Sequence, residues 1–350
     1  MSKPELHLII PRLFQPLNVW HNDFSFSADA LSLSNLLKQY KVSQSYSGTG
    51  LHAGVFASIG CFEGELPIAQ YRFQALQNPK TVRNRGGVFE NNPKMLLCAD
   101  PVHLEVGIND ITMTDYMDDL SDADAIAIID ALNAHFEQDG IEFIRGSNAQ
   151  WYLSLPQEED VATTPLSEAL RKNIINFLPE SKDRNWKIIQ NETQMLLHGL
   201  SINQEREMQG LATVNSLWFW GAGQAQDFKH TVTSVMGSEI LAAAADCPKQ
   251  ELTENTDFQA LSKSAKGKTV VVLDQLMDAA LYDDVDRFQQ VLTHLDHTII
   301  RPLLSEWNAG KINISIDSCD GKILQPQKAP SWKFWAKPAS LLKVARDIKA

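Results

Sequence analysis

Two polar side chains shortly before an apolar run are the groups in this 350-residue chain best suited to hold an anion. Asn203 and Arg206 stand in a polar segment, an apolar aromatic run over 214–220 follows, and the run ends at Gly221 and Gly223. An arginine guanidinium binds phosphate or carboxylate through a forked, permanently charged set of donors, and backbone N–H groups of a loop can also face an anion. The stretch predicts a short helix, a buried strand and a glycine loop at the strand's carboxyl end, where open α/β sheets bind ligands.

The same groups also have ordinary structural interpretations. Asparagine is a common helix N-cap, an arginine suits a solvated surface, and a lone Gly-x-Gly fits a tight turn. Trp218 and Trp220 would point to one face of a strand, which more often means core or interface than a ligand platform. Asp100 and His103 predict either a polar pair for a ligand, or a turn aspartate before proline beside a capped or solvated histidine.

Composition limits the classes of partner and compartment. The net charge of −12 comes from acidic residues spread along the chain, which disfavours nucleic-acid binding because phosphate contacts need clustered Lys and Arg. No apolar run approaches the ~20 residues of a membrane span, and the first residues lack a signal peptide's apolar core. The four cysteines are scattered without a C-x-x-C pair, so neither a zinc knuckle nor a disulfide framework is predicted. We expect a cytoplasmic location.

The elements that would position these groups alternate between strands and helices in both outer thirds of the chain. Pro302 is expected to kink or end the long helix, and the aromatic tail at 332–335 suits docking or packing onto the core. The predicted elements are strands at 6–10, 231–236, 269–273 and 312–316, helices at 28–40, 51–60, 237–245 and 285–303, and loops at 42–50 and 80–93.

A separate strand–helix–hairpin module is predicted within the first half of the chain. A strand begins at Met95, Ser121 with Asp124 resembles a capping box, and apolar residues at helical spacing follow until Gly140. Segments 141–144 and 150–155 read as a hairpin. The sequence therefore predicts an α/β fold, with residues 1–93 and 159–350 forming a core sheet flanked by helices and residues 94–158 forming a small inserted α+β domain.

Several motifs together resemble a known family. Over 198–223 the pattern of Asn203, Arg206, Gly210, Asn215, Gly221 and Gly223 resembles the cofactor-independent phosphoglycerate mutases of the archaeal type. A bacterial family called regulatory protein RpfE is more similar, through the segments 100–104, 151–153 and 218–221. The resemblance implies an alkaline-phosphatase-like core and an inserted domain that helps to hold a phosphorylated substrate.

The resemblance also implies a site with two divalent metals and a hydroxyl nucleophile, which can be checked motif by motif. Two metals clamp the attacking and leaving oxygens of a phosphoryl displacement. The first metal motif should follow strand one, where Pro11 and its neighbours offer no carboxylate. The nucleophile motif is met only weakly by Thr49, which lacks the aspartate that should follow it.

The remaining two motifs keep carboxylates but lose histidines. Asp278 and Asp283 match the third motif with Tyr282 in place of its histidine, and Asp317 matches the fourth with Ser318 in place of its histidine. We therefore expect that two-metal catalysis is lost and that no cofactor is needed. Binding of a single hard cation by the three carboxylates is the remaining alternative.

Two functions follow from this interpretation. The first is a binding or regulatory protein on an enzyme-derived scaffold, a pseudoenzyme whose partner is a small anionic metabolite or another protein. The alternative is a metal-dependent mutase or phosphatase-type enzyme with a rebuilt, atypical site. Neither involves nucleic acid or a membrane.

Overall fold

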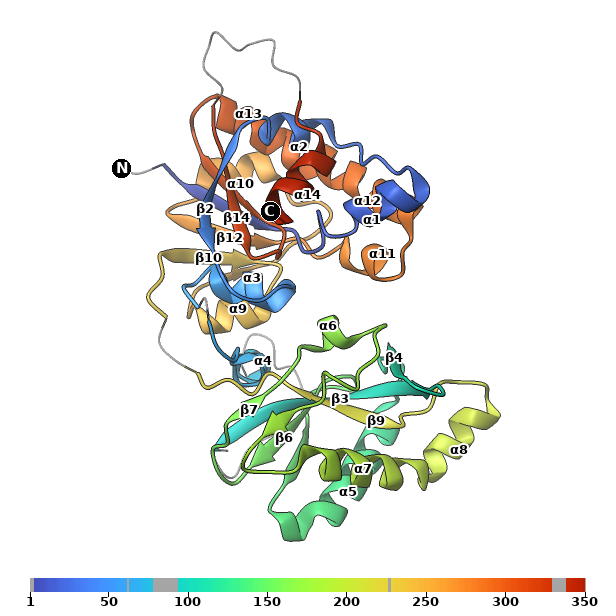
Figure 1. Cartoon of the computed structure of the whole chain (residues 1–350). Coiled ribbons are helices and arrows are strands. Elements are labelled where there is room, and N and C mark those ends of the chain that lie inside the picture. Colours follow the sequence, from blue (N-terminus) through green and yellow to red (C-terminus); the bar gives the residue numbers. More distant parts are fainter. Residues whose placement is uncertain (1–2, 62, 78–93, 226–227, 329–337, 350) are drawn as a thin grey trace. The chain divides into compact units, whose positions relative to one another are not determined.

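The computed structural model describes residues 3–61, 63–77, 94–225, 228–328 and 338–349, which form two compact units (Figure 1). Residues 1–63 and 227–350 make one, called the core unit, and residues 64–226 make the other, called the inserted unit. The inserted unit is larger than the predicted module at 94–158. The bounds differ because β9 (Ser216–Trp220), far along the chain, pairs with β3 (Met95–Val106).

Within the described residues, the core unit contains seven strands and their covering helices. Its strands are β1 (Glu5–Ile9), β2 (Tyr40–Ser45), β10 (Val232–Met236), β11 (Lys249–Gln250), β12 (Lys268–Val272), β13 (Asn313–Asp317) and β14 (Lys322–Pro326). Its helices are α1 (Leu17–Phe24), α2 (Leu31–Leu36), α3 (Leu51–Ala57), α9 (Glu239–Ala244), α10 (Phe258–Ser264), α11 (Met277–Leu281), α12 (Val285–Leu295), the π-helical η2 (Asp296–Ile300), α13 (Arg301–Asn308) and α14 (Leu341–Lys349).

The core sheet has the order β11-β10-β12-β1-β13-β14-β2, with β1 parallel to both β12 and β13. Buried strands with apolar side chains are typical of such parallel sheets, because helices cover them. Leu6 and Leu8 of β1 belong to a core cluster that also includes buried residues of α1, α2 and α12–α14. The predicted α/β class, a central sheet flanked by helices, is confirmed.

One strand of this sheet was predicted as a loop. The Ser- and Gly-rich segment 42–50 begins within β2, whose residues pair antiparallel with β14 from Tyr40 to Ser45. The helix predicted at 28–40 is correspondingly shorter, because α2 ends at Leu36. Local composition favoured a loop, and pairing with β14 overrode it.

A long helical segment, far from α2 in sequence, supports the start of α2. Pro302 does not end this segment, which passes from α12 through the π turn η2 into α13. Asp296 in that turn is buried, and its carboxylate accepts the backbone N–H groups of Ser32 (3.0 Å) and Leu33 (2.7 Å). Ala30, the residue before α2, has no side-chain acceptor. Asp296 therefore caps α2 across 264 residues of sequence.

Replacing Asp296 by alanine is expected to lower the free energy of unfolding of the core unit by about 2 kcal/mol, because two buried N–H groups lose their acceptor. Asp296→Asn is the matched control, since its single amide oxygen still accepts one of them and the loss is expected to be smaller. Urea denaturation followed by circular dichroism measures both. Equal midpoints for the alanine variant and the wild type would contradict the capping role.

The inserted unit combines an antiparallel sheet with helices. Its strands are β3, β4 (Ile111–Tyr116), β5 (Glu142–Arg145), β6 (Trp151–Leu155), β7 (Val161–Ala162), β8 (Glu180–Ser181) and β9. Its helices are α4 (Ile68–Gln77), α5 (Asp122–Phe136), the 3₁₀ turn η1 (Glu137–Asp139), α6 (Leu166–Ala169), α7 (Trp186–His198) and α8 (Ser201–Met208).

The predicted local features of this unit are present. Ser121 caps α5 by accepting the N–H of Asp124 (3.1 Å), and β5 and β6 form the predicted hairpin. Buried residues of α5, α7 and the sheet share one apolar cluster. The predicted loop at 80–93 and the aromatic tail at 332–335 lie outside the described residues. Within the described ranges, no helix is long and apolar enough to cross a membrane.

Candidate functional site

The stretch predicted to bind an anion forms α8, β9 and the glycine loop, as expected, but in a different sheet. β9 is antiparallel to β3 in the inserted unit, where Cys98 pairs with Trp220 and Val102 with Ser216. The rule that ligands bind at strand carboxyl ends applies to parallel α/β sheets, so it does not extend to this loop. Trp218 and Trp220 are buried, in agreement with a core role.

Asn203 is buried and supports the segment before β9. Its amide nitrogen donates to the carbonyl oxygens of Leu197 (2.7 Å) and Val214 (2.8 Å), and its oxygen accepts the N–H of Val214 (2.8 Å). Asn203 lies inside α8 rather than at its N-cap, which is Leu200. The N-cap interpretation is therefore wrong, and the side chain instead fixes Val214 beside the helix.

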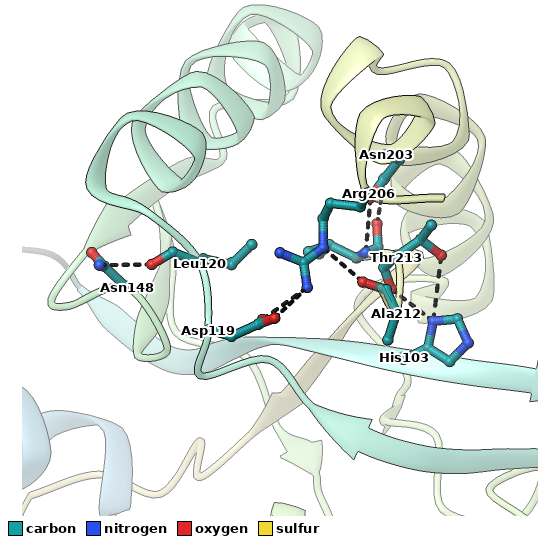
Figure 2. A network of polar contacts seen from close by, with 9 residues as sticks. His103, Asp119, Leu120, Asn148, Asn203, Arg206, Ala212 and Thr213 are labelled. Carbon is teal, nitrogen blue, oxygen red and sulfur yellow. Dashed lines mark hydrogen bonds and ion pairs between the residues drawn. The ribbon is translucent and has the colours of Figure 1, made fainter. Parts of the chain in front are cut away.

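Arg206 is also buried, so the surface interpretation is wrong. Its Nε donates to the carbonyl oxygen of Ala212 (2.7 Å), and its Nη2 lies 2.8 and 2.7 Å from the two carboxylate oxygens of Asp119 (Figure 2). Figure 2 shows the guanidinium between α8 and the segment that carries Asp119. An anionic ligand at Arg206 would have to compete with this carboxylate.

The glycine loop is closely packed against the start of the inserted unit. Gly221 has φ +72° and donates its N–H to the hydroxyl of Thr163 (3.0 Å), while the N–H of Gly223 donates to the carbonyl oxygen of Leu66 (3.2 Å). A Cβ on Gly223 would lie 2.3 Å from the carbonyl oxygen of Glu65. Both N–H groups are thus used within the unit, and the glycines allow two backbone segments to approach each other.

Asp100 and His103 do not form a pair. Asp100 is buried within β3, and its carboxylate takes both Nη groups of Arg72 (2.8 and 2.5 Å) and the indole N–H of Trp220 (2.8 Å). The Nδ1 of His103 bonds to the carbonyl oxygen of Thr213 (2.7 Å). The turn interpretation of Asp100 is wrong as well, because β3 runs through Pro101.

Asp317, the carboxylate of the fourth metal motif, lies at the carboxyl edge of the core sheet. Asp317 ends β13 beside Ile9 of β1 and is fully buried. Its Oδ1 accepts the Tyr46 hydroxyl (2.8 Å) and the Cys319 N–H (2.7 Å), whereas its buried Oδ2 accepts no hydrogen bond from the described residues. A Cβ on Gly54 of α3 would lie 3.3 Å from Oδ2 and 2.6 Å from the Cys319 sulfur, so the helix packs directly over this carboxyl group.

Burial raises the pKa of Asp317 to about 7, and the hydrogen bonds from Cys319 and Tyr46 only partly oppose the rise. The folded protein therefore holds this proton more tightly than the unfolded chain. The stability contribution is fully present below the unfolded pKa near 4 and is lost as pH rises through about 7.

Asp317→Asn is expected to remove this part of the pH dependence. Relative to the variant, the wild type should lose up to about 4 kcal/mol of unfolding free energy between pH 4 and pH 8, since each pKa unit is about 1.4 kcal/mol. Thermal unfolding of EDTA-treated protein across that range measures the difference. Parallel curves for the wild type and the variant would contradict a neutral, buried Asp317.

The other two carboxylates of the metal motifs have different surroundings. Asp283 has φ +53° and its Oδ1 accepts the indole N–H of Trp20 (2.8 Å), while Asp278 is exposed on α11. Among the described residues, no three His, Cys, Asp or Glu side chains are placed to hold a metal ion together. The single-cation arrangement on Asp278, Asp283 and Asp317 is therefore not formed among the described residues.

Thr49 is exposed in the loop between β2 and α3. The neighbouring Gly50 donates its N–H to the carbonyl oxygen of Cys319 (2.8 Å), so this loop lies at the same sheet edge as Asp317. After β1, where the mutase pattern has a carboxylate, the chain continues through buried Pro11 to Arg12 at φ +61°. The edge thus brings a hydroxyl-bearing loop to Asp317 without a second carboxylate after β1.

Several residues that define these environments were not singled out from the sequence. Glycine inside a predicted helix often marks a close approach, and this signal at Gly54 could have located the contact with Cys319 and Asp317. An aspartate in an apolar strand also needs a partner, but nothing local identifies Arg72, 28 residues before Asp100. The same holds for Asp119, 87 residues from Arg206.

Comparisons with known proteins show a shared fold. No protein-family model and no curated protein sequence matches the chain. A cofactor-independent phosphoglycerate mutase from Thermoplasma acidophilum DSM 1728 is 14% identical over 99% of each chain, with a TM-score of 0.42. The PH0037 protein from Pyrococcus horikoshii is 12% identical over 93% of this chain and 88% of its own, with a TM-score of 0.51. At these identities the likeness concerns the fold alone, and it rests on the second structure.

Proposed function

We propose that this chain is a phosphoglycerate-mutase-like protein that has lost two-metal phosphoryl transfer and acts as a binding or regulatory protein. The observation that carries the proposal is the state of Asp317. This carboxyl group is buried under α3, accepts hydrogen bonds from Tyr46 and Cys319, and has a pKa raised to about 7. A metal ligand must be reachable by the ion, whereas Oδ1 of Asp317 is occupied by two donors and α3 packs over Oδ2.

The other motif positions support the same proposal. Two-metal catalysis needs carboxylates and histidines from several strand ends to converge on one place. Here Pro11 stands after β1, Tyr282 and Ser318 stand at histidine positions, and Asp283 is engaged by Trp20. Ligands are missing from several separate motifs. This supports loss of the reaction more strongly than one local change would.

A binding role is compatible with this scaffold because both units keep well-formed cores. The two polar residues of the candidate anion motif have structural roles. Asn203 is hydrogen-bonded to Val214, and Arg206 is paired with Asp119. We therefore place less weight on a small anionic metabolite than on a protein partner, and regulation through protein binding becomes the preferred form of the proposal.

The direct test is the mutase reaction itself. Purified full-length chain is expected to give no Mn²⁺-dependent isomerisation of 3-phosphoglycerate above background, and no hydrolysis of p-nitrophenyl phosphate, because its residues do not hold the metal pair. A cofactor-independent mutase assayed in parallel confirms that the conditions support turnover. Robust manganese-dependent turnover that disappears in Thr49→Ala would overturn the proposal and favour the rebuilt enzyme. Turnover that survives Thr49→Ala would point to a contaminating enzyme.

A further inference from the structure

Lysines gather at the amino-terminal edge of the core sheet, on a chain whose net charge is −12. Lys3 precedes β1, Lys38 and Lys41 stand at the start of β2, and Lys311 precedes β13. Lys328 reaches the same edge because β14 is antiparallel to β13 and the N–H of Gln327 bonds to the carbonyl oxygen of Gln39 (2.8 Å). This set of five is called the edge lysines.

Two of these ammonium groups meet around one glycine. The position of a Cβ on Gly310 is 3.6 Å from Nζ of Lys328 and 3.7 Å from Nζ of Lys3. The Lys328 ammonium also donates to the carbonyl oxygen of Asn308 (3.0 Å). Two like charges around one residue raise the local positive potential and favour a negatively charged partner.

Carboxylates of the core unit neutralise only part of this charge. Glu306 pairs with Lys311 (2.9 Å), and Asp347 is engaged by the Tyr40 hydroxyl (2.9 Å). Glu5 lies at the start of β1. Lys3, Lys38, Lys41 and Lys328 form no ion pair with any residue that the structure describes.

The strand that carries Lys41 has an open edge. β2 ends the core sheet, since β14 is its only neighbour among the described strands (Figure 1). Residues 41–45 are all exposed, including Val42, so neither face of the strand end is covered by the described residues. An edge strand offers unpaired N–H and C=O groups that can pair with another strand, and extended peptides bind proteins in this way.

We propose that the outer edge of β2, with Lys38 and Lys41 at its start and Lys328 beside it, binds an extended acidic segment of another protein by strand addition. Backbone hydrogen bonds to β2 would supply affinity, Val42 would meet an apolar side chain, and carboxylates would meet Lys41 and its neighbours. A second copy of this chain fits less well, because both copies are acidic overall and repel each other.

Fluorescence anisotropy of labelled 12-residue peptides with the full-length chain tests this surface. The probe alternates Glu with Val or Thr, and two matched peptides carry Lys in place of Glu or two central prolines. Only the acidic, proline-free peptide is expected to bind. Its affinity should fall roughly tenfold or more between low and high salt, since exposed charges are screened.

Two double variants with the same change in net charge distinguish binding at this surface from a general effect of the charge of the protein. Lys41→Glu/Lys328→Glu is expected to weaken binding roughly tenfold, whereas Lys182→Glu/Lys187→Glu, in the inserted unit, should leave it unchanged. All four side chains are exposed, so circular dichroism should be unaltered. Equal loss in both variants, binding of the proline peptide, or no binding of the acidic peptide would overturn the proposal. So would a dimer by light scattering that Lys41→Glu dissociates. Turnover is measured separately, so this proposal and the proposed loss of catalysis can fail independently.

Discussion

Arg72→Met is expected to lower the free energy of unfolding of the inserted unit by about 3–5 kcal/mol. This is the usual cost of leaving one member of a buried ion pair without its partner. Arg72 of α4 donates to both oxygens of Asp100, and both side chains are buried. The guanidinium also lies 5.3 Å from the ring centre of Tyr152 and 5.6 Å from that of Trp220. Methionine would keep much of the volume, but among the described residues it would leave the Asp100 carboxylate with only Trp220 and Trp151 as donors.

Urea denaturation monitored by tryptophan fluorescence measures this effect, because Trp151 and Trp220 adjoin the pair. Arg145→Met is the matched control: its partner Asp122 is 77% exposed, so a change below about 1 kcal/mol is expected. Arg72→Met/Asp100→Asn should recover part of the loss, since it removes the unpaired charge. A loss no larger than that of Arg145→Met would show that the buried pair is not stabilising.

Gly223→Ala is expected to destabilise the inserted unit by about 3 kcal/mol or more, at the upper end of the cost of overpacking. The new Cβ would lie 2.3 Å from the carbonyl oxygen of Glu65, 2.5 Å from the carbonyl carbon of Leu66 and 2.6 Å from the nitrogen of Pro67. All three are backbone atoms, so relief requires the two segments to separate. Their separation would also strain the Gly223–Leu66 hydrogen bond (3.2 Å).

The control for this substitution is Gly210→Ala. Gly210 has φ +72° but no atom within 4 Å of its Cβ position, so only the conformational cost of about 1–2 kcal/mol is expected. Thermal unfolding of the two variants compares steric and conformational costs directly. If Gly223→Ala is no less stable than Gly210→Ala, the close packing at Gly223 is not rigid.

The features that could be predicted from the sequence are those that depend on neighbours along the chain. Ser121 and Asp124 identified the start of α5, and the apolar alternation around 312–316 identified β13. The α/β class follows from the alternation of such elements. β2 was missed because its Ser- and Gly-containing sequence is typical of loops, and only its pairing with β14 makes it a strand.

The candidate site was harder to predict because its contacts join distant residues. Asn203 and Arg206 have the chemistry of ligand-binding groups, yet their partners, Val214 and Asp119, lie inside the same unit. A polar side chain before a buried strand can serve a ligand or the backbone, and sequence spacing does not distinguish the two. Asp317 is similar, since its neighbour Tyr46 is 271 residues away.

The pairing between residues 65–70 and 221–225 has a topological consequence for the inserted unit. Leu66 is bonded to Gly223 and Ala69 to Gly221, and the Gln70 side chain accepts the N–H of Ala225. The chain therefore enters and leaves this unit at neighbouring positions, tied together by its own backbone. A unit whose two ends lie side by side can be inserted into a surface loop of another domain, because the ends of that loop do not have to move apart. The two ends of the inserted unit are thus joined by hydrogen bonds that lie within the unit itself.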